Sequence, residues 1–265
     1  MQIKRIDRIQ YLAVDFTGSP CSTQGFTSRH EGVSRPPYNS LNLGINTPDQ
    51  QSNVEGNRSL LARAFGVDQD ALVTPKQVHG VDILVINEPN EDYSHFLSVE
   101  GDAVITNQPQ VMIGVCVADC VPILLCDPEK GVIAAVHAGW KGTAGKLVSK
   151  VVAGMQSEFG CDPGGLQAAI GPCIQKCCYE VDGPVKQAFV QGGIAWAEFA
   201  ELSGEGKWKL DLAAANRELL LLAGVPAAAV QLSDQCVCCH SELFFSYRRD
   251  KDDAGRQMGF IMLRS

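Results

Sequence analysis

The chain has 265 residues, of which 45% are apolar and 20% charged, close to the averages for globular domains. It can therefore bury a sizeable core, which excludes the fibrous and disordered classes. Lysine and arginine number 22 against 30 acidic residues, so the net charge is −8 and nucleic acid is not an expected partner. No run approaches the ~18 uncharged apolar residues of a transmembrane helix, so we expect no membrane partner either.

The 11 cysteines are many for a chain of this size, and their number is odd. Residues 1–15 carry several charges and lack the apolar stretch and cleavage site of a signal peptide. The adjacent pairs Cys177-Cys178 and Cys238-Cys239 suit a disulfide framework poorly. We therefore expect a reduced, cytoplasmic protein whose cysteines are core fillers, metal ligands or a nucleophile.

Hydrophobic patterning predicts more strands than helices. In chain order, the predicted strands are Ile9–Phe16, Asp82–Ile86, Ala103–Thr106, Val111–Val117, Pro122–Cys126, Val132–His137, Gln167–Ile170, Leu243–Tyr247 and Gln257–Leu263. Amphipathic spacing predicts helices, each followed by a glycine, at Val54–Phe65, Thr143–Phe159 and Leu212–Ala223. Asn53 or Ser52 is the expected cap of the first helix, and Asp211 that of the third.

The order of these elements indicates the fold class. Because strands and helices do not alternate strictly, a doubly wound fold or an eightfold barrel is disfavoured. We predict an α+β fold with mixed β-sheets covered by helices, either as a single domain over residues 1–265 or as two closely packed halves. The long polar insertion Asn87–Gly101 is the kind of segment that is often a lid or simply mobile.

Three segments place reactive side chains beside otherwise apolar strands. They contain His79 in Pro75–Gly80, Cys120 between a strand and Pro122, and His137 before a glycine turn. Two imidazoles and one thiolate are a standard ligand set for catalytic zinc with one open position. Such a site lowers the pKa of water to about 7. Spacing alone leaves open the alternative that these residues serve packing and hydrogen bonding.

A set of motifs spread over nearly the whole chain resembles the YfiH-type family, also called the laccase-domain or multicopper polyphenol oxidase family. The matching segments are Thr27–Ser34, Pro37–Gly44, Lys76–Gly80, Gly101–Thr106, Ala118–Leu125, Ala135–Thr143, Ile170–Ile174, Tyr179–Val181 and Phe244–Asp250. The resemblance implies a single-domain α+β fold and zinc held by His79, Cys120 and His137. It further implies phosphorolysis of adenosine, inosine, guanosine or methylthioadenosine, and deamination of adenosine.

Within the matched motifs, several residues are candidates for this chemistry. Asp119 beside Cys120 is the candidate acid–base group, with orientation of a ligand or capping of a turn as the alternative. Candidate substrate-binding residues are the cations Arg29, Lys76 and Arg248 for phosphate, Asn42 and Gln77 for base or ribose hydroxyls, and Tyr179 for stacking. Arg249 is expected to form an ion pair with Asp250. The implied partners are a purine nucleoside and phosphate, and the oligomeric state is not predicted.

Three other functions remain open at this point. The family's name suggests a copper-dependent polyphenol oxidase, with copper in place of zinc, although this chain has only five histidines. Cys120 and His137 could instead form the nucleophile and base of a cysteine hydrolase or of an enzyme that edits cell-wall precursors. A sensor that binds a nucleotide without turnover is the non-enzymatic alternative.

The remaining cysteines could include a second metal cluster. Cys236, Cys238, Cys239 and His240 look like ligands, but no second C-x-x-C pair accompanies them. We expect Cys173, Cys177 and Cys178 to pack or to line the edge of the cleft.

Overall fold

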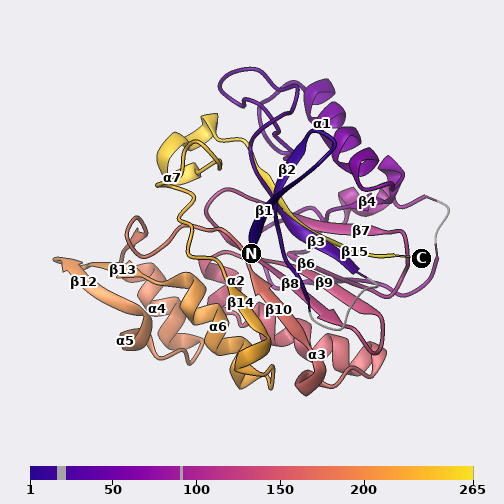
Figure 1. Ribbon diagram of the computed structural model, residues 1–265. Helices are drawn as coiled ribbons and strands as arrows, with labels where there is room; N and C mark the ends of the chain where they lie inside the picture. The colour runs from indigo at the N-terminus through magenta and orange to yellow at the C-terminus, as the bar shows by residue number, and fades with distance from the viewer. Residues whose placement is uncertain (17–21, 90–91, 265) are drawn as a thin grey trace.

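Two six-stranded β-sheets form the frame of the molecule, in a computed structural model that describes residues 1–16, 22–89 and 92–264 (Figure 1). The first sheet has the order β1 (Gln2–Ile6), β2 (Ile9–Ala13), β3 (Ser22–Thr27), β15 (Gln257–Leu263), β7 (Met112–Val117) and β4 (Leu72–Val73). The second has the order β14 (Val230–Leu232), β10 (Gln167–Ile170), β8 (Val121–Asp127), β9 (Val132–Ala138), β6 (Ala103–Thr106) and β5 (Ile83–Ile86). Both sheets mix parallel and antiparallel pairs.

The two sheets face each other across a shared core. Phe26 and Ile113 of the first sheet belong to the same buried cluster as Leu124 and Ala135 of the second. Since alternate residues of a strand point to opposite faces, the outer faces are also apolar and need a cover. Helix α1 (Gln51–Ala64) covers the first sheet, and α3 (Leu147–Phe159) with α6 (Leu212–Leu222) covers the second. The result is a four-layer arrangement, visible from α1 to α3 in Figure 1.

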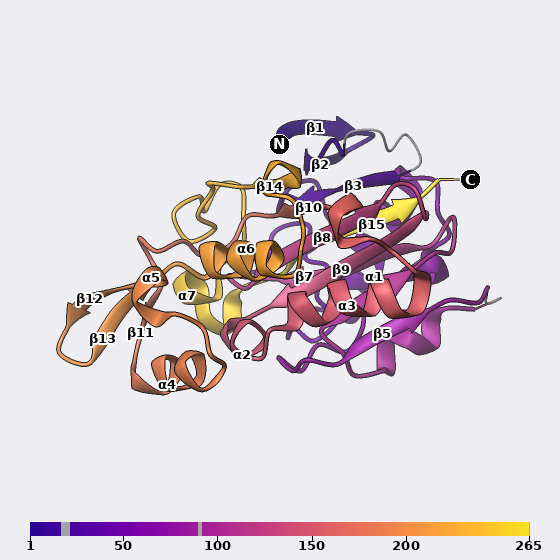
Figure 2. The ribbon, with the colours of Figure 1, turned by 90° about the horizontal axis from the view of Figure 1, so that it is seen from below.

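A small extension projects from one end of these layers, beside α6 (Figure 2). It contains the three-stranded sheet β11 (Glu180–Val181), β13 (Lys207–Leu210) and β12 (Ala200–Gly204), with α4 (Gly183–Gln191) and α5 (Trp196–Phe199). The remaining helices are α2 (Trp140–Ala144) and α7 (Tyr247–Asp250). Short 3₁₀ helices lie at Gln69–Ala71, Ser94–Ser98, Pro163–Gly165, Ala227–Ala229 and Lys251–Asp253. Among the described residues, no helix is both long and apolar enough to cross a membrane.

The α+β prediction is confirmed, and eight of the nine predicted strands are present with shifts at their ends. The strand predicted at Leu243–Tyr247 is wrong. Phe244 and Phe245 are fully buried, but the main chain of Phe245 bonds the side chain of Gln257 in both directions, and Ser246 caps α7. A buried irregular segment therefore produced the apolar run that was interpreted as a strand.

The helix predictions need smaller corrections. Helix α1 begins at Gln51, and its N-cap is Gln50 rather than Asn53 or Ser52. The helix predicted at Thr143–Phe159 is split into α2 and α3, because Lys146 adopts a left-handed conformation with φ 57°. Asp211 caps α6 as predicted, accepting a hydrogen bond from the Ala214 N–H at 2.8 Å. Sequence patterning missed β1, β3, the three-stranded sheet and α4.

The polar insertion Asn87–Gly101 contains a helical turn. Residues 90–91 of this insertion lie outside the described residues. Beyond them, the 3₁₀ helix Ser94–Ser98 follows Tyr93, which is buried in the core shared by the two sheets. Residues 92–99 do not line the cavity described below.

Candidate metal centre and active site

Three connections that cross between the two sheets meet at one place. The first joins β4 to β5 and carries His79, and the second joins β7 to β8 and carries Asp119 and Cys120. The third joins β14 to β15 and contains α7 and Arg256. Chain segments distant in sequence therefore converge at the end of the sheet pair, where loops supply functional side chains from a rigid frame.

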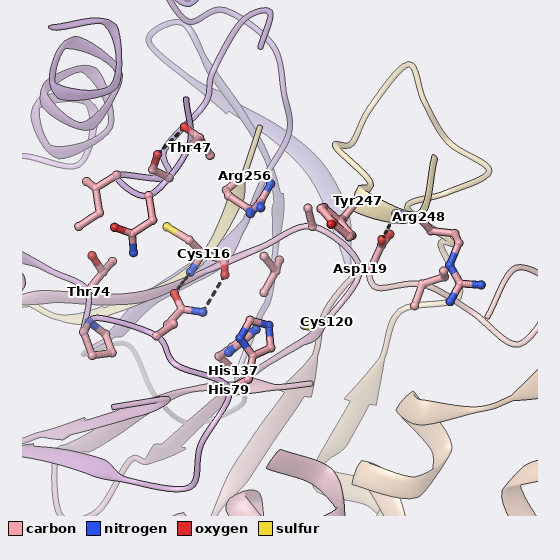
Figure 3. Close-up of a pocket in the computed structure, with 18 of the residues that line it drawn as sticks. Thr47, Thr74, His79, Cys116, Asp119, Cys120, His137, Tyr247, Arg248 and Arg256 are labelled. Carbon is pink, nitrogen blue, oxygen red and sulfur yellow. Dashed lines mark hydrogen bonds between the residues drawn. The ribbon is translucent and has the colours of Figure 1, made fainter. Parts of the chain in front are cut away.

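His79, Cys120 and His137 lie together at this junction, as Figure 3 shows for the two histidines. One ligand atom from each residue lies within 4.8 Å of those of the other two. The register of β8 and β9 pairs Pro122 with His137, which brings the start of β8 next to the histidine. The two imidazole rings meet edge to face, with centroids 4.8 Å apart. These are the residues that the sequence predicted as metal ligands.

Asp102 holds both histidines in place, and sequence reasoning gave it no role. Its carboxylate is fully buried and accepts a hydrogen bond from His137 Nδ1 at 2.7 Å. It also accepts the main-chain N–H groups of Val78, His79 and Gly80, at 3.3, 3.0 and 2.6 Å. Because Nδ1 of His137 is engaged, Nε2 is the nitrogen that is left for a metal. A buried acid at the start of an apolar strand was the available sequence signal.

The electrostatics of the cluster favour a thiolate. Burial opposes ionisation of Cys120, but the charge of His137 and hydrogen bonds from both histidines outweigh it and lower the pKa of Cys120 to about 6. Burial also disfavours the charged form of His137, yet Cys120 and Asp102 raise its pKa to about 9. The thiolate is the form of cysteine that binds a divalent metal ion, and the positive charge of the ion would stabilise it.

The backbone at Gly139 passes close to two side chains of the cluster. A Cβ atom added at Gly139 would lie 3.1 Å from Cys120 Sγ and 3.2 Å from His79 Cδ2. Glycine at this position therefore keeps the ligands uncrowded. Together with the two imidazoles, the thiolate and the Asp102 hydrogen bond, this arrangement matches a three-ligand catalytic site with its supporting outer contacts.

The cluster lies in the wall of a cavity of about 460 Å³. This volume falls within the roughly 300–1,000 Å³ that is usual for small-molecule sites. The residues that line it are Gly44, Ile45, Asn46, Thr47, Thr74, Pro75, Gln77, His79, Cys116, Val117, Ala118, Asp119, Cys120, His137, Ile174, Tyr179, Leu212, Tyr247, Arg248 and Arg256. Figure 3 shows Arg256 near Thr47 and Cys116, and Tyr247 and Arg248 beyond Asp119.

Four further residues predicted from the sequence line this cavity: Asp119, Gln77, Tyr179 and Arg248. The Asp119 carboxylate accepts hydrogen bonds from the Ser246 hydroxyl and the Arg248 main-chain N–H. Burial raises the pKa of Asp119, although these hydrogen bonds oppose the shift. The Gln77 amide bonds the main chain of Cys116 in both directions, at 2.8 Å each. Arg248 lies over the Tyr179 ring, 5.3 Å from its centroid.

The other predicted substrate-binding residues are not part of the cavity wall. Asn42 is fully buried, and its amide bonds Thr47, Asp49 and the N–H groups of Gly44 and Arg256. Lys76 is exposed and pairs with Glu100 at 2.8 Å.

Arg29 and Arg249 lie at a separate surface hollow. Arg29 donates to the carbonyls of Asn39 and Ser241 and lies over the Phe245 ring. Arg249 forms the predicted ion pair with Asp250, at 2.7 Å.

Arg256 is a cation of the cavity wall that the sequence analysis did not single out. It donates to the carbonyls of Ala254 and Gly255, which uses one end of its guanidinium. Its stem packs so tightly against Gly44 that a Cβ there would lie 2.5 Å from Arg256 Cγ. The sequence signal was weak, since Arg256 follows the motif Phe244–Asp250 without belonging to it.

Comparison with known proteins agrees with this architecture. The fold and site define an α+β protein of two facing sheets with a His₂Cys cluster beside a small-molecule cavity. Residues 23–264 match the family described as multi-copper polyphenol oxidoreductase laccase, and the chain belongs to this family. The predicted resemblance is thereby confirmed.

Similar proteins are named for purine nucleoside chemistry. The chain is 36% identical over 248 residues to purine nucleoside phosphorylase YlmD of Geobacillus stearothermophilus, covering 89% of this chain and 88% of the relative. It is 37% identical over 254 residues to adenosine deaminase RL5 from an unknown prokaryotic organism, covering 94% and 97%. The crystal structure of YlmD from Geobacillus stearothermophilus matches with a TM-score of 0.91 at 33% identity, covering 99% of this chain and 98% of that one.

Proposed function

We propose that the chain is a zinc-dependent purine nucleoside phosphorylase that also deaminates adenosine. The observation that carries the proposal is the His79, Cys120 and His137 cluster in the wall of a cavity that also presents Arg248 and Arg256. The relatives' names give the substrate class, and adenosine, inosine, guanosine and methylthioadenosine are the proposed nucleosides. Bound at this open site, zinc would supply Lewis acidity and activate water.

In phosphorolysis, the bond between ribose C1′ and the purine nitrogen breaks, and a phosphate oxygen bonds to C1′. The purine leaves with the bonding electrons and takes up a proton. Arg256 and Arg248 are the proposed phosphate partners, because guanidinium groups match phosphate oxygens. Arg248 is positioned by donation to the carbonyls of Cys178 and Glu180, at 3.3 and 3.0 Å. Tyr179 and Tyr247 offer aromatic faces to the base.

In deamination, water adds at C6 of adenine, the C6–N bond breaks, and ammonia leaves. This requires a group that moves a proton to the leaving nitrogen. Asp119 is the carboxyl group among the described residues that line the cavity, and we assign it this role. Its contacts with Ser246 and Arg248 also fix the start of α7, so a substitution there has to separate the two effects.

The number of histidines at the cavity argues against a multicopper oxidase site. His79 and His137 are the histidines of the cluster, whereas the other three lie elsewhere. His240 bonds Glu242, His95 lies in the 3₁₀ helix Ser94–Ser98, and His30 lines the separate hollow. A multicopper centre needs more imidazoles than this cluster has. The thiol of Cys120 also suits a reducing compartment such as the cytoplasm, where we place the reaction.

The test is a metal-quantified assay with adenosine, with and without phosphate. We expect inosine without phosphate, and adenine, hypoxanthine and ribose 1-phosphate only with phosphate. We also expect zinc rather than copper in the purified protein. His79→Ala should lose zinc from this site and both activities, while His95→Ala, which changes an exposed histidine, should keep them. Zinc-loaded protein that forms neither adenine nor inosine would contradict the proposal. Labelling of Cys120 with turnover after metal removal would favour the cysteine hydrolase instead.

A further inference from the structure

Four cysteine sulphurs gather outside the active site. They belong to Cys177 and Cys178, in the turn before β11, and to Cys236 and Cys239, in the turn after β14. Their Sγ atoms all lie within 4.8 Å of one another. The Cys177–Cys178, Cys177–Cys239 and Cys178–Cys239 separations are 3.7, 3.8 and 3.4 Å. The described cysteines form no disulfide.

These separations match the edges of a metal–thiolate tetrahedron. With Zn–S bonds of about 2.3 Å, tetrahedral geometry places the sulphurs about 3.8 Å apart. A disulfide would instead bring two of them to about 2.05 Å. Four thiols on two turns, all within 4.8 Å of one another, are thus arranged around a common centre rather than in pairs.

We propose that Cys177, Cys178, Cys236 and Cys239 bind one structural zinc ion in a closed four-thiolate site, separate from the His79, Cys120 and His137 cluster. Zn²⁺ displaces the thiol protons to solvent, and no oxidation is involved. With four protein ligands no position is open for water or substrate, so this ion would stabilise structure rather than catalyse.

Hydrogen bonds around the cluster support bound thiolates. The main-chain N–H of Gln175 donates to Cys236 Sγ at 3.4 Å, as outer contacts of metal ligands commonly do. Lys209 Nζ donates to the Cys177 carbonyl at 3.2 Å, which places a positive charge beside a centre that carries net negative charge.

The ligand set differs from the cluster suggested by the sequence. Cys236 and Cys239 are retained as a C-x-x-C pair, but Cys238 is not in the group of four, and His240 Nδ1 bonds Glu242 at 3.0 Å. The second pair of ligands is the adjacent Cys177-Cys178. From the sequence, these two cysteines were expected to pack or to line the edge of the cleft. The sequence could not pair these segments because about sixty residues separate them.

The proposed ion would fasten the wall of the catalytic cavity. Cys178 precedes Tyr179, and its carbonyl accepts Arg248 Nη1 at 3.3 Å. On the other turn, the carbonyls of Val237 and Cys238 accept Arg249 Nη1. Joining the two turns therefore fixes the segment from which Tyr179 and Arg248 reach the cavity. This gives the second site a structural purpose without contact with substrate.

The test is zinc stoichiometry by elemental analysis of reduced full-length protein after dialysis against a weak chelator. Wild type should retain about two zinc ions per chain, and Cys239→Ser and His79→Ala about one each. Both Cys177 and Cys239 are exposed, so Cys177→Ser provides an independent variant with little risk to folding. Cys238→Ser is the matched control and should keep both ions.

Separate variants distinguish failure of this proposal from failure of the catalytic site. Loss of one ion in His79→Ala, with Cys239→Ser equal to wild type, would overturn the four-cysteine site alone. So would iron in place of zinc, or a chain mass lower by two hydrogens that shows a disulfide in freshly reduced, metal-free protein. Replacement of the ion by Co²⁺ should give visible absorption of a four-thiolate site in His79→Ala that Cys177→Ser and Cys239→Ser abolish.

Discussion

Replacing Asp102 with asparagine should weaken zinc binding more than any other conservative change outside the ligands. Asparagine keeps one acceptor oxygen for His137 and His79, but its NH₂ group then faces the N–H groups of Gly80 and Val78. The two hydrogen bonds from these N–H groups to the buried carboxylate are lost, and N–H groups then face the NH₂ group of the asparagine. Hydrogen bonds to charged groups contribute about 1.5–3 kcal/mol each, so the free energy of unfolding should fall by about 3 kcal/mol or more.

The effect on metal affinity has a separate origin. Without the carboxylate, the His137 ring is oriented less firmly and its Nε2 is less basic. Removal of such an outer partner typically costs 10–100-fold in metal affinity, or about 1.4–2.7 kcal/mol. Zinc dissociation constants measured by competition with a chromogenic chelator should show this loss for Asp102→Asn.

Asp127→Asn provides the matched control. Asp127 is also buried in the second sheet, and its carboxylate accepts the N–H groups of Glu129 and Lys130 at 2.9 Å each, at the β8–β9 turn. This variant should lose stability and keep wild-type zinc affinity at the catalytic cluster. Equal zinc affinity in Asp102→Asn, Asp127→Asn and wild type would refute the assigned role of Asp102, whatever the melting temperatures.

Three further predictions concern the proposed metal site and the candidate phosphate-binding cations. Gly139→Ala should lower zinc affinity several-fold because its Cβ would crowd Cys120 Sγ at 3.1 Å, whereas Gly165→Ala, with nothing within 4 Å, should not change chelator competition. Arg256→Gln should raise the KM for phosphate about 10-fold or more, the equivalent of one charge-assisted hydrogen bond, and should change steady-state deamination much less. Lys76→Ala removes an exposed ion pair, so it should cost less than about 1 kcal/mol in thermal unfolding and leave the phosphate KM unchanged. A phosphate KM raised equally by Lys76→Ala and Arg256→Gln would contradict the placement of these two cations.

The proposed metal ligands were found from the sequence because the chemistry of their side chains is local. His79 lies in the loop between β4 and β5, Cys120 directly precedes β8 and His137 lies near the end of β9, and the fold brings these three predicted ligands together. Asp102 was missed because one acid before an apolar strand is a weak signal. Its importance comes from four hydrogen-bond donors that two separate segments contribute.

For the substrate-binding residues, side-chain chemistry alone did not identify which ones line the cavity. Asn42, Arg29 and Lys76 were selected for side-chain chemistry within matched motifs. Asn42 instead satisfies main-chain groups and neighbouring side chains in a buried turn, which is a frequent use of asparagine. Arg256 was missed although it lines the cavity, because its position depends on how the segment from α7 to β15 passes Gly44. Residue type alone does not reveal which side of a turn faces a cavity.

The way the chain connects its two sheets explains why this site is assembled from loops. His79, Asp119 with Cys120, and Arg256 lie on three separate connections that pass from one sheet to the other, and each connection has to cross the same end of the sheet pair. Such crossings demand backbone conformations that strands do not supply: His79 has φ 59° and Asp119 φ 94°. Both residues are thereby turned out of the strand direction, and hydrogen bonds to Asp102 and from Ser246 hold the two turns. The strained crossings therefore carry the reactive side chains, and the shared core of the two sheets fixes the positions of His79 and Cys120 in the proposed metal site.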